Sequence, residues 1–168
     1  NVEFRRGKIQ DLQTNLDIVD GYLQANPVRS VADLAKLQAY QAKMRQEQPL
    51  IADESIDVIV SNCVLNLVRP EDKKQLFAEM YRVLKRGGRI AISDIVSDEA
   101  VPEHLAKDPD LWSACVSGSF QEEDFLRAFE DAKFHGIQIE ELRTEAYQTV
   151  EGIEFRAVTV TAYKGKEG

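Results

Sequence analysis

A strand–helix–strand pattern over residues 56–94 constrains the fold more than any other feature of this chain. Residues 56–61 (I-D-V-I-V-S) form a nearly continuous apolar run, which is typical of a parallel strand covered on both faces. The Pro-Glu-Asp sequence at 70–72 is typical of a helix N-terminus, and apolar residues then recur at helical spacing as far as Gly-Gly at 87–88. Residues 89–94 predict the next strand, so the pattern favours an open α/β sheet.

The rest of the chain supplies further elements. Residues 2–6 alternate apolar and polar side chains and predict a strand. The polar block 13–50 predicts a surface hairpin of two helices, the second of which begins with a capping box at Ser30. A similar box at Ser119 predicts a helix over 122–134.

Two more strands are expected at the end of the chain, over residues 137–143 and 155–163. Because they follow each other directly, we expect an antiparallel pair at one edge of the sheet.

Composition excludes several classes of function. The 168 residues suffice for one domain, and 21 basic against 29 acidic residues give a net charge of −8, which argues against binding to nucleic acid or to an anionic membrane surface. No apolar run approaches the roughly 20 residues that span a bilayer. With no export signal visible, the two cysteines are expected to be reduced thiols and the protein to be cytosolic.

Those two cysteines carry the chemistry that the sequence suggests. Cys63 directly follows the first strand of the 56–94 unit, and ligands of open α/β sheets bind just beyond the carboxyl ends of strands. Cys115 follows Trp112 on a short stretch where a helix would place both side chains on one face. Thiolates bind soft metal and metalloid centres, whereas a cysteine without such a role is usually a small buried hydrophobe.

Two sequence motifs resemble a known enzyme family. Residues 82–90 (R-V-L-K-R-G-G-R-I), with a strand before and after, resemble the class I S-adenosylmethionine-dependent methyltransferases. Residues 61–67 (S-N-C-V-L-N-L) and 110–115 (D-L-W-S-A-C) resemble the arsenite methyltransferases among them. Residues 2–10 and 154–164 are similar to that family as well.

The resemblance implies a fold and a reaction. The expected fold is an incomplete, doubly wound, Rossmann-like α/β sheet, with residues 1–168 forming a single partial domain and residues 13–50 inserted into it. Cys63 and Cys115 would be the catalytic thiolates that hold trivalent arsenic, supplied as arsenite or its thiol conjugate. The arsenic lone pair would then take a methyl group from S-adenosylmethionine in line.

The resemblance also implies positions for the cofactor. Ile9 and Gln10 match the place where the family contacts adenine, although Gln10 replaces the expected acid. Asn62 and Val64 would flank the pocket of the methyl donor.

Other features of the family pattern are absent from this sequence. It has no Gly-x-Gly loop and no acidic residue to hold a ribose, so we expect the chain to begin at the family's third strand and to be inactive by itself. The absent strands would lie between residues 2–6 and 56–61. The 2–6 strand, left without a neighbour, and the 13–50 block are the two candidates for a homodimer contact.

The same sequence features are compatible with two other functions. The same fold would serve a methyltransferase for a quinone or another small molecule, and only the cysteines favour arsenic. A truncated, non-catalytic methyltransferase-like module would also account for the absent cofactor loop.

Overall fold

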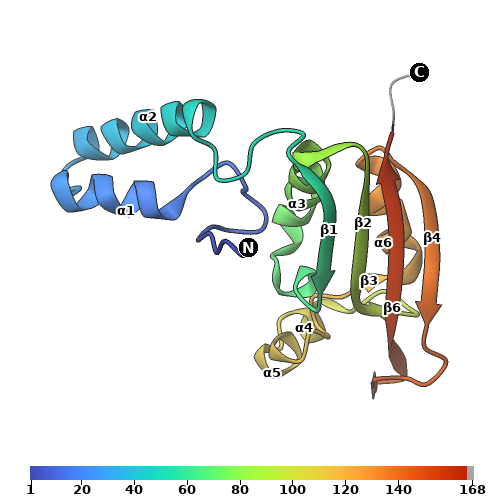
Figure 1. Cartoon of the computed structure of the whole chain (residues 1–168). Coiled ribbons are helices and arrows are strands. Elements are labelled where there is room, and N and C mark those ends of the chain that lie inside the picture. The colour runs from blue at the N-terminus through green and yellow to red at the C-terminus, as the bar shows by residue number, and fades with distance from the viewer. Residues whose placement is uncertain (166–168) are drawn as a thin grey trace.

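The computed structural model describes residues 1–165, which form a mixed α/β sheet with helices packed on it (Figure 1). The main strands lie in the order β1-β2-β6-β4, with β1 parallel to β2 and β6 antiparallel to both β2 and β4. Their bounds are β1 Ile56–Asn62, β2 Leu84–Ser97, β4 Phe134–Leu142 and β6 Ile153–Lys164. Two short strands lie beside these: β3 (Phe120–Gln121) pairs with β2, and β5 (Gln148–Val150) pairs with β6.

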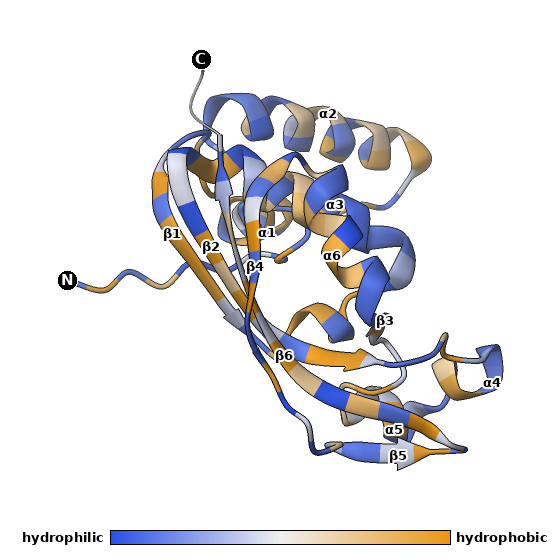
Figure 2. Ribbon diagram, turned by 90° about the vertical axis from the view of Figure 1, so that its right-hand side faces the viewer, coloured by the Kyte–Doolittle hydropathy of each residue, from blue (hydrophilic) through white to orange (hydrophobic). Residues whose placement is uncertain are grey.

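The core lies between the sheet and two helices, α3 (Pro70–Val83) and α6 (Glu122–Asp131), which cover one side of it (Figure 2). Phe77 of α3 meets Phe129 of α6 edge to face with ring centroids 5.0 Å apart, and Phe125 packs on Phe129. These rings rest on Ile90 and Ile92 of β2. Burial of this aromatic group fixes the helices against the central strand, and with them the strand ends.

β1 was expected to be covered on both faces, and this expectation is wrong. Val58 and Val60 are 55% and 75% exposed, whereas Ile59 packs against the core. β1 lies at the end of the strand order, and α3 and α6 cover one face of the sheet. Val58 and Val60 point to the opposite face, because successive side chains of a strand alternate between its two faces.

The strand predicted over residues 2–6 does not form. Val2 and Phe4 are 82% and 94% exposed, and these residues have no strand conformation. Arg5 instead pairs with Glu3 and donates a hydrogen bond to the backbone oxygen of Leu50. The alternating pattern cannot by itself make a strand, since a single strand without a ladder partner is not stable.

The helix that begins at Pro70 ends earlier than predicted. It stops at Val83, and Leu84 is already extended and pairs with Ile56 of β1. Gly87 adopts φ +76° where the pairing register shifts between residues 56 and 58 of β1, so the glycines shape an irregular start of β2 rather than a helix end.

The helical hairpin predicted over residues 13–50 is confirmed. It consists of α1 (Leu16–Ala25) and α2 (Val31–Glu47), which project away from the sheet (Figure 1). The Ser30 side chain accepts a hydrogen bond from the Asp33 N–H, as the capping box predicts, and Tyr22 stacks on Tyr40 at 4.2 Å.

The antiparallel pair at the end of the chain is confirmed as β4 and β6, with β6 on the inside and β4 at the edge. The prediction of a capping box at Ser119 is wrong, because the box does not form. α6 has Gln121 as its N-cap residue without a side-chain bond, and residues 120–121 pair with β2 instead. Within residues 1–165, none of the helices combines the length and apolar character needed to cross a membrane.

Candidate functional site

The first cysteine lies at the carboxyl end of β1. Cys63 directly follows Asn62, the last residue of the strand, and its N–H donates to the Ser93 oxygen of β2 at 2.9 Å. The backbone then turns, with φ +53° at Cys63, and the next residues enter the short 3₁₀ helix η1 (Leu65–Leu67). This turn leaves the thiol side chain exposed beyond the strand end.

The second cysteine reaches the same place from the loop after β2. That loop contains the short helices α4 (Glu103–Ala106) and α5 (Pro109–Ser113). Because α5 ends at Ser113, Cys115 lies in the turn after it, with φ +61° and its N–H bonded to the Trp112 oxygen at 3.0 Å. The expectation that Trp112 and Cys115 share a helix face is therefore wrong, although the segment is helical before the cysteine.

The structure brings the two predicted ligands together. The Sγ atom of Cys115 lies 3.5 Å from the backbone oxygen of Cys63, and it donates a weak hydrogen bond there. The two residues are 52 positions apart in the sequence, and both thiols are free. A pair of thiols at one sheet edge can bind a single soft atom from two sides.

The surroundings of both thiols raise their pKa and so disfavour the thiolate form. Burial raises the pKa of Cys63 above the ordinary value, and the negative charge of Asp94 raises it further. The pKa of Cys115 is raised by burial, by Asp94 and by the neighbouring Cys63. Because these influences all oppose a thiolate charge, a ligand that leaves the sulfurs neutral is favoured.

Asp94, in β2, lies beneath this pair and is almost fully buried. Its carboxylate accepts hydrogen bonds from the N–H groups of Leu65 at 3.0 Å, Asn66 at 3.4 Å and Ile95 at 2.9 Å. Burial raises the pKa of Asp94, while these bonds and the charge of Lys73 partly oppose that shift. Asp94 thus ties the start of η1, two residues after Cys63, to β2.

Asn66 is a residue that sequence reasoning did not single out. Its side chain is fully buried and donates to the backbone oxygens of Ile95 at 2.7 Å and Cys115 at 3.0 Å. Only the folded chain places these two carbonyls beside one another.

The four residues predicted to bind the cofactor lie in two places. Asn62 lines a hollow of about 200 Å³ that also includes Cys63 and Asp94, whereas Val64, the residue after Cys63, is exposed and does not line it. Ile9 packs against the core from the turn at residues 8–11, and Gln10 is half-buried in the same turn.

That turn belongs to the other end of α3. The N–H of Leu12 donates to the Glu79 carboxylate in the last turns of the helix, whereas η1 and Cys63 lie before its first turn. The structure therefore does not bring Ile9 and Gln10 to Asn62 and Val64.

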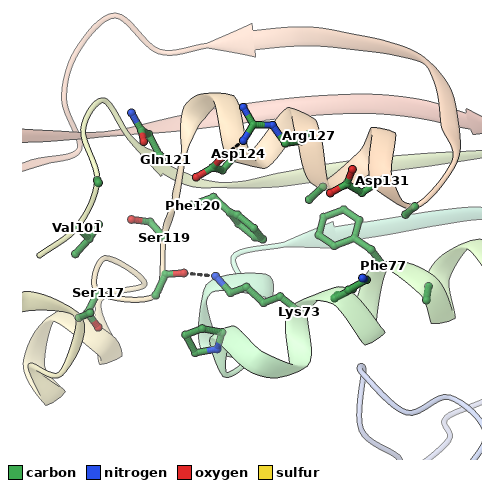
Figure 3. A pocket seen from close by; sticks show the side chains of 18 residues that line it. Lys73, Phe77, Val101, Ser117, Ser119, Phe120, Gln121, Asp124, Arg127 and Asp131 are labelled. Atoms are coloured by element: carbon green, nitrogen blue, oxygen red, sulfur yellow. Dashed lines mark hydrogen bonds and ion pairs between the residues drawn. The ribbon is translucent and has the colours of Figure 1, made fainter. Parts of the chain in front are cut away.

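A larger cavity, of about 590 Å³, lies between α3, α6 and the loop after β2 (Figure 3). Phe77, Phe120 and Ala128 give it apolar walls, and neither cysteine lines it. The segment 117–119 separates this cavity from Cys115. In the described part of the chain, no group of three or more His, Cys, Asp or Glu side chains is placed to hold a metal ion.

Curated relatives share this sequence at moderate identity. An arsenite methyltransferase of Halobacterium salinarum is 43% identical over 89 residues, which are 53% of this chain and 22% of that protein. The mouse arsenite methyltransferase is 43% identical over 74 residues, which are 44% of this chain and 19% of that protein. The matched part thus spans about a fifth of the length of these relatives.

Solved structures share the fold. An arsenic(III) S-adenosylmethionine methyltransferase from Chlamydomonas reinhardtii superposes with a TM-score of 0.61 at 28% identity, covering 71% of this chain and 41% of that one. A phosphoethanolamine N-methyltransferase from Haemonchus contortus reaches a TM-score of 0.54 at 14% identity, covering 75% of this chain and 40% of that one, which shows the fold alone.

The predicted fold class, a partial class I methyltransferase sheet, is confirmed by these structures. The family model described as a methyltransferase domain matches residues 23–133, the segment that contains β1, β2 and both cysteines. The chain belongs to the methyltransferase domain family.

Proposed function

We propose that this chain carries the arsenic-binding part of an S-adenosylmethionine-dependent arsenite methyltransferase, with Cys63 and Cys115 as the arsenic ligands. The observation that carries the proposal is the 3.5 Å approach of the Cys115 sulfur to the Cys63 backbone. The curated relatives that match this chain are named arsenite methyltransferases, which supports the same substrate.

The raised pKa of the two thiols is compatible with arsenite as a ligand. Arsenous acid, As(OH)₃, condenses with two thiols to give two As–S bonds and two molecules of water. Each thiol proton leaves on a departing hydroxide, so no charge remains on sulfur. The raised pKa values of Cys63 and Cys115 are therefore compatible with binding, and the neutral product avoids repulsion from Asp94.

The residues at the end of β1 fit the methyl-bearing end of the cofactor. S-adenosylmethionine supplies an electrophilic methyl group when it is bound. Asn62 lines the hollow of about 200 Å³ with its amide, and the carboxylate of Asp94 gives this hollow a negative charge that suits a sulfonium. Val64, two residues after Asn62, offers an exposed apolar side chain. The proposal keeps Asn62 and Val64 only, because the turn that carries Ile9 and Gln10 lies at the opposite end of α3.

The chain's own contribution to the reaction is to place the acceptor. Two ligands on separate loops hold arsenic at a fixed point next to Asn62 and Val64, which turns an encounter of two molecules into a positioned transfer.

A cytosolic location, and a homodimer contact through residues 2–6 or the α1–α2 hairpin, are further parts of the proposal. Sedimentation of the protein with and without Phe4→Asp tests the contact at residues 2–6.

Titration with trivalent arsenic tests the assignment. The protein should bind one arsenic atom per chain, with the near-ultraviolet absorption of As–S bonds, and Cys63→Ser or Cys115→Ser should each remove that absorption change. Ser113→Ala, two residues before Cys115, is the matched control and should bind normally. Arsenic binding that survives both cysteine substitutions would exclude Cys63 and Cys115 as the arsenic ligands and favour a different small-molecule acceptor for the enzyme.

A further inference from the structure

We infer that Asn66 and Lys73 act as positioning residues that hold the segment of Cys115 beside Cys63, where the Cys115 sulfur lies 3.5 Å from the Cys63 backbone oxygen. We call these two side chains the polar clamp. The inference rests on the proposed function, because a clamp matters only if one ligand bridges both thiols. Neither residue is expected to touch arsenic.

Asn66 joins the two loops that carry the thiols. Its amide nitrogen bonds the Ile95 oxygen at 2.7 Å and the Cys115 oxygen at 3.0 Å. Both partners are carbonyl acceptors, so only the NH₂ group of the amide can satisfy them, which fixes the orientation of the side chain. One buried group therefore ties the backbone of Cys115 to the end of β2.

The same residue is fixed relative to Cys63. The N–H of Asn66 donates to the buried Asp94 carboxylate at 3.4 Å, and Leu65 donates there at 3.0 Å. Cys63 itself bonds Ser93, the residue before Asp94. The backbones of both cysteines are thus hydrogen-bonded to the same short stretch of β2. Cys63 is bonded to it directly, and Cys115 is connected to it through the Asn66 amide.

Lys73 holds the segment after Cys115. Its ammonium donates to the backbone oxygen of Gly118 (Figure 3) and lies 4.0 Å from the centre of the Phe120 ring. Lys73 is only 7% exposed, so this bond is screened little by solvent. A Cβ at Gly118 would lie 1.9 Å from the Asn66 backbone oxygen, so the segment runs directly against η1.

The clamp therefore acts on both sides of one short segment. Asn66 holds the carbonyl of Cys115, and Lys73 holds the carbonyl three residues later. A ligand that forms bonds to two thiols gains affinity in proportion to how well the second thiol is held near the first. Loss of either tie should lower that effective concentration without changing the thiols themselves.

The test compares a two-thiol ligand with a one-thiol reagent. Phenylarsine oxide condenses with two thiols, whereas iodoacetamide alkylates each thiol separately. In Asn66→Leu, which keeps the size of the side chain, and in Lys73→Met, we expect about a tenfold loss of phenylarsine oxide affinity at pH 7, because each tie is a buried hydrogen bond. Alkylation rates should stay within about twofold of the parent, since one-thiol chemistry does not need the second thiol.

Lys74→Met is the matched control, since Lys74 is the exposed neighbour of Lys73 on α3, and it should bind phenylarsine oxide as the parent does. If Asn66→Leu fails to show a cooperative unfolding transition, Lys73→Met decides the question. Folded Asn66→Leu or Lys73→Met protein that keeps full phenylarsine oxide affinity overturns the clamp. If the Cys63→Ser variant binds phenylarsine oxide as tightly as the parent protein does, the proposed function is overturned instead.

Discussion

Replacing Lys73 by methionine should change how the stability of the protein depends on pH. Burial lowers the pKa of Lys73 from the ordinary 10.5 to about 8, against the opposing attraction of Asp94. A methionine side chain has a similar length and does not titrate. The difference between the two proteins therefore isolates the titration of one amine.

The sign follows from proton binding. Between pH 8 and 10.5 the unfolded chain keeps the Lys73 proton while the folded chain has released it. The unfolded state then binds more protons, so the free energy of unfolding of the parent rises with pH relative to the variant. One pKa unit is worth about 1.4 kcal/mol, which gives a total relative gain of about 3 kcal/mol, roughly 2.5 of it between pH 7 and 10.

Chemical denaturation at a series of pH values measures this gain. Urea unfolding of both proteins, followed by circular dichroism and by the emission of the single tryptophan, Trp112, gives the free energy of unfolding at each pH. Lys74→Met serves as the control, because its exposed amine lacks the burial of Lys73.

A difference between parent and Lys73→Met that stays flat from pH 7 to 10, or that falls, would refute the reasoning. It would mean that the amine is not held in the buried position beside Gly118 and Phe120.

Three further substitutions test other parts of the structure. Asp94→Asn removes the charge that opposes both thiolates, so the pH at half-maximal iodoacetamide alkylation of Cys63 and Cys115 should fall; an unchanged or higher value would contradict this. Phe129→Ala should cost about 3 to 5 kcal/mol in urea unfolding, because it empties the centre of the aromatic core, and a loss below about 1 kcal/mol would contradict that packing. Ser119→Ala should be neutral or stabilise by about 1 kcal/mol, because the Ser119 hydroxyl is buried without a partner, whereas a capping serine would cost about 1 kcal/mol on removal.

The sequence predicted the elements whose signals are local. The helices over 13–50 follow from the Ser30 cap and helical spacing, and the helix start at Pro70 follows from its first-turn residues. Where a local pattern depends on a distant partner, prediction failed. Residues 2–6 alternate apolar and polar side chains as a strand does, but they have no strand to pair with. The capping box at Ser119 does not form, because residues 120–121 pair with β2 instead.

The candidate site shows the same division. Cys63 was placed at a strand end because the apolar run before it is read directly from the sequence. Its contact with Cys115 depends on the path of the loop that follows β2, and local spacing does not describe that path. Asn66 and Lys73 were missed for a similar reason: their partners, the oxygens of Cys115 and Gly118, are backbone atoms that carry no sequence signal.

The backbone at the two cysteines favours a functional reason for their position. Both adopt left-handed φ angles, +53° at Cys63 and +61° at Cys115, where glycine or asparagine would be less strained. Left-handed residues elsewhere in the chain, such as Glu54 and Glu151, are charged and exposed, as is ordinary in turns. A cysteine gains nothing in such a turn, and each costs about 1 kcal/mol relative to glycine. The only two cysteines of the chain both occupy such positions and face one site, so the strain is better explained by the need to place two thiols together than by packing.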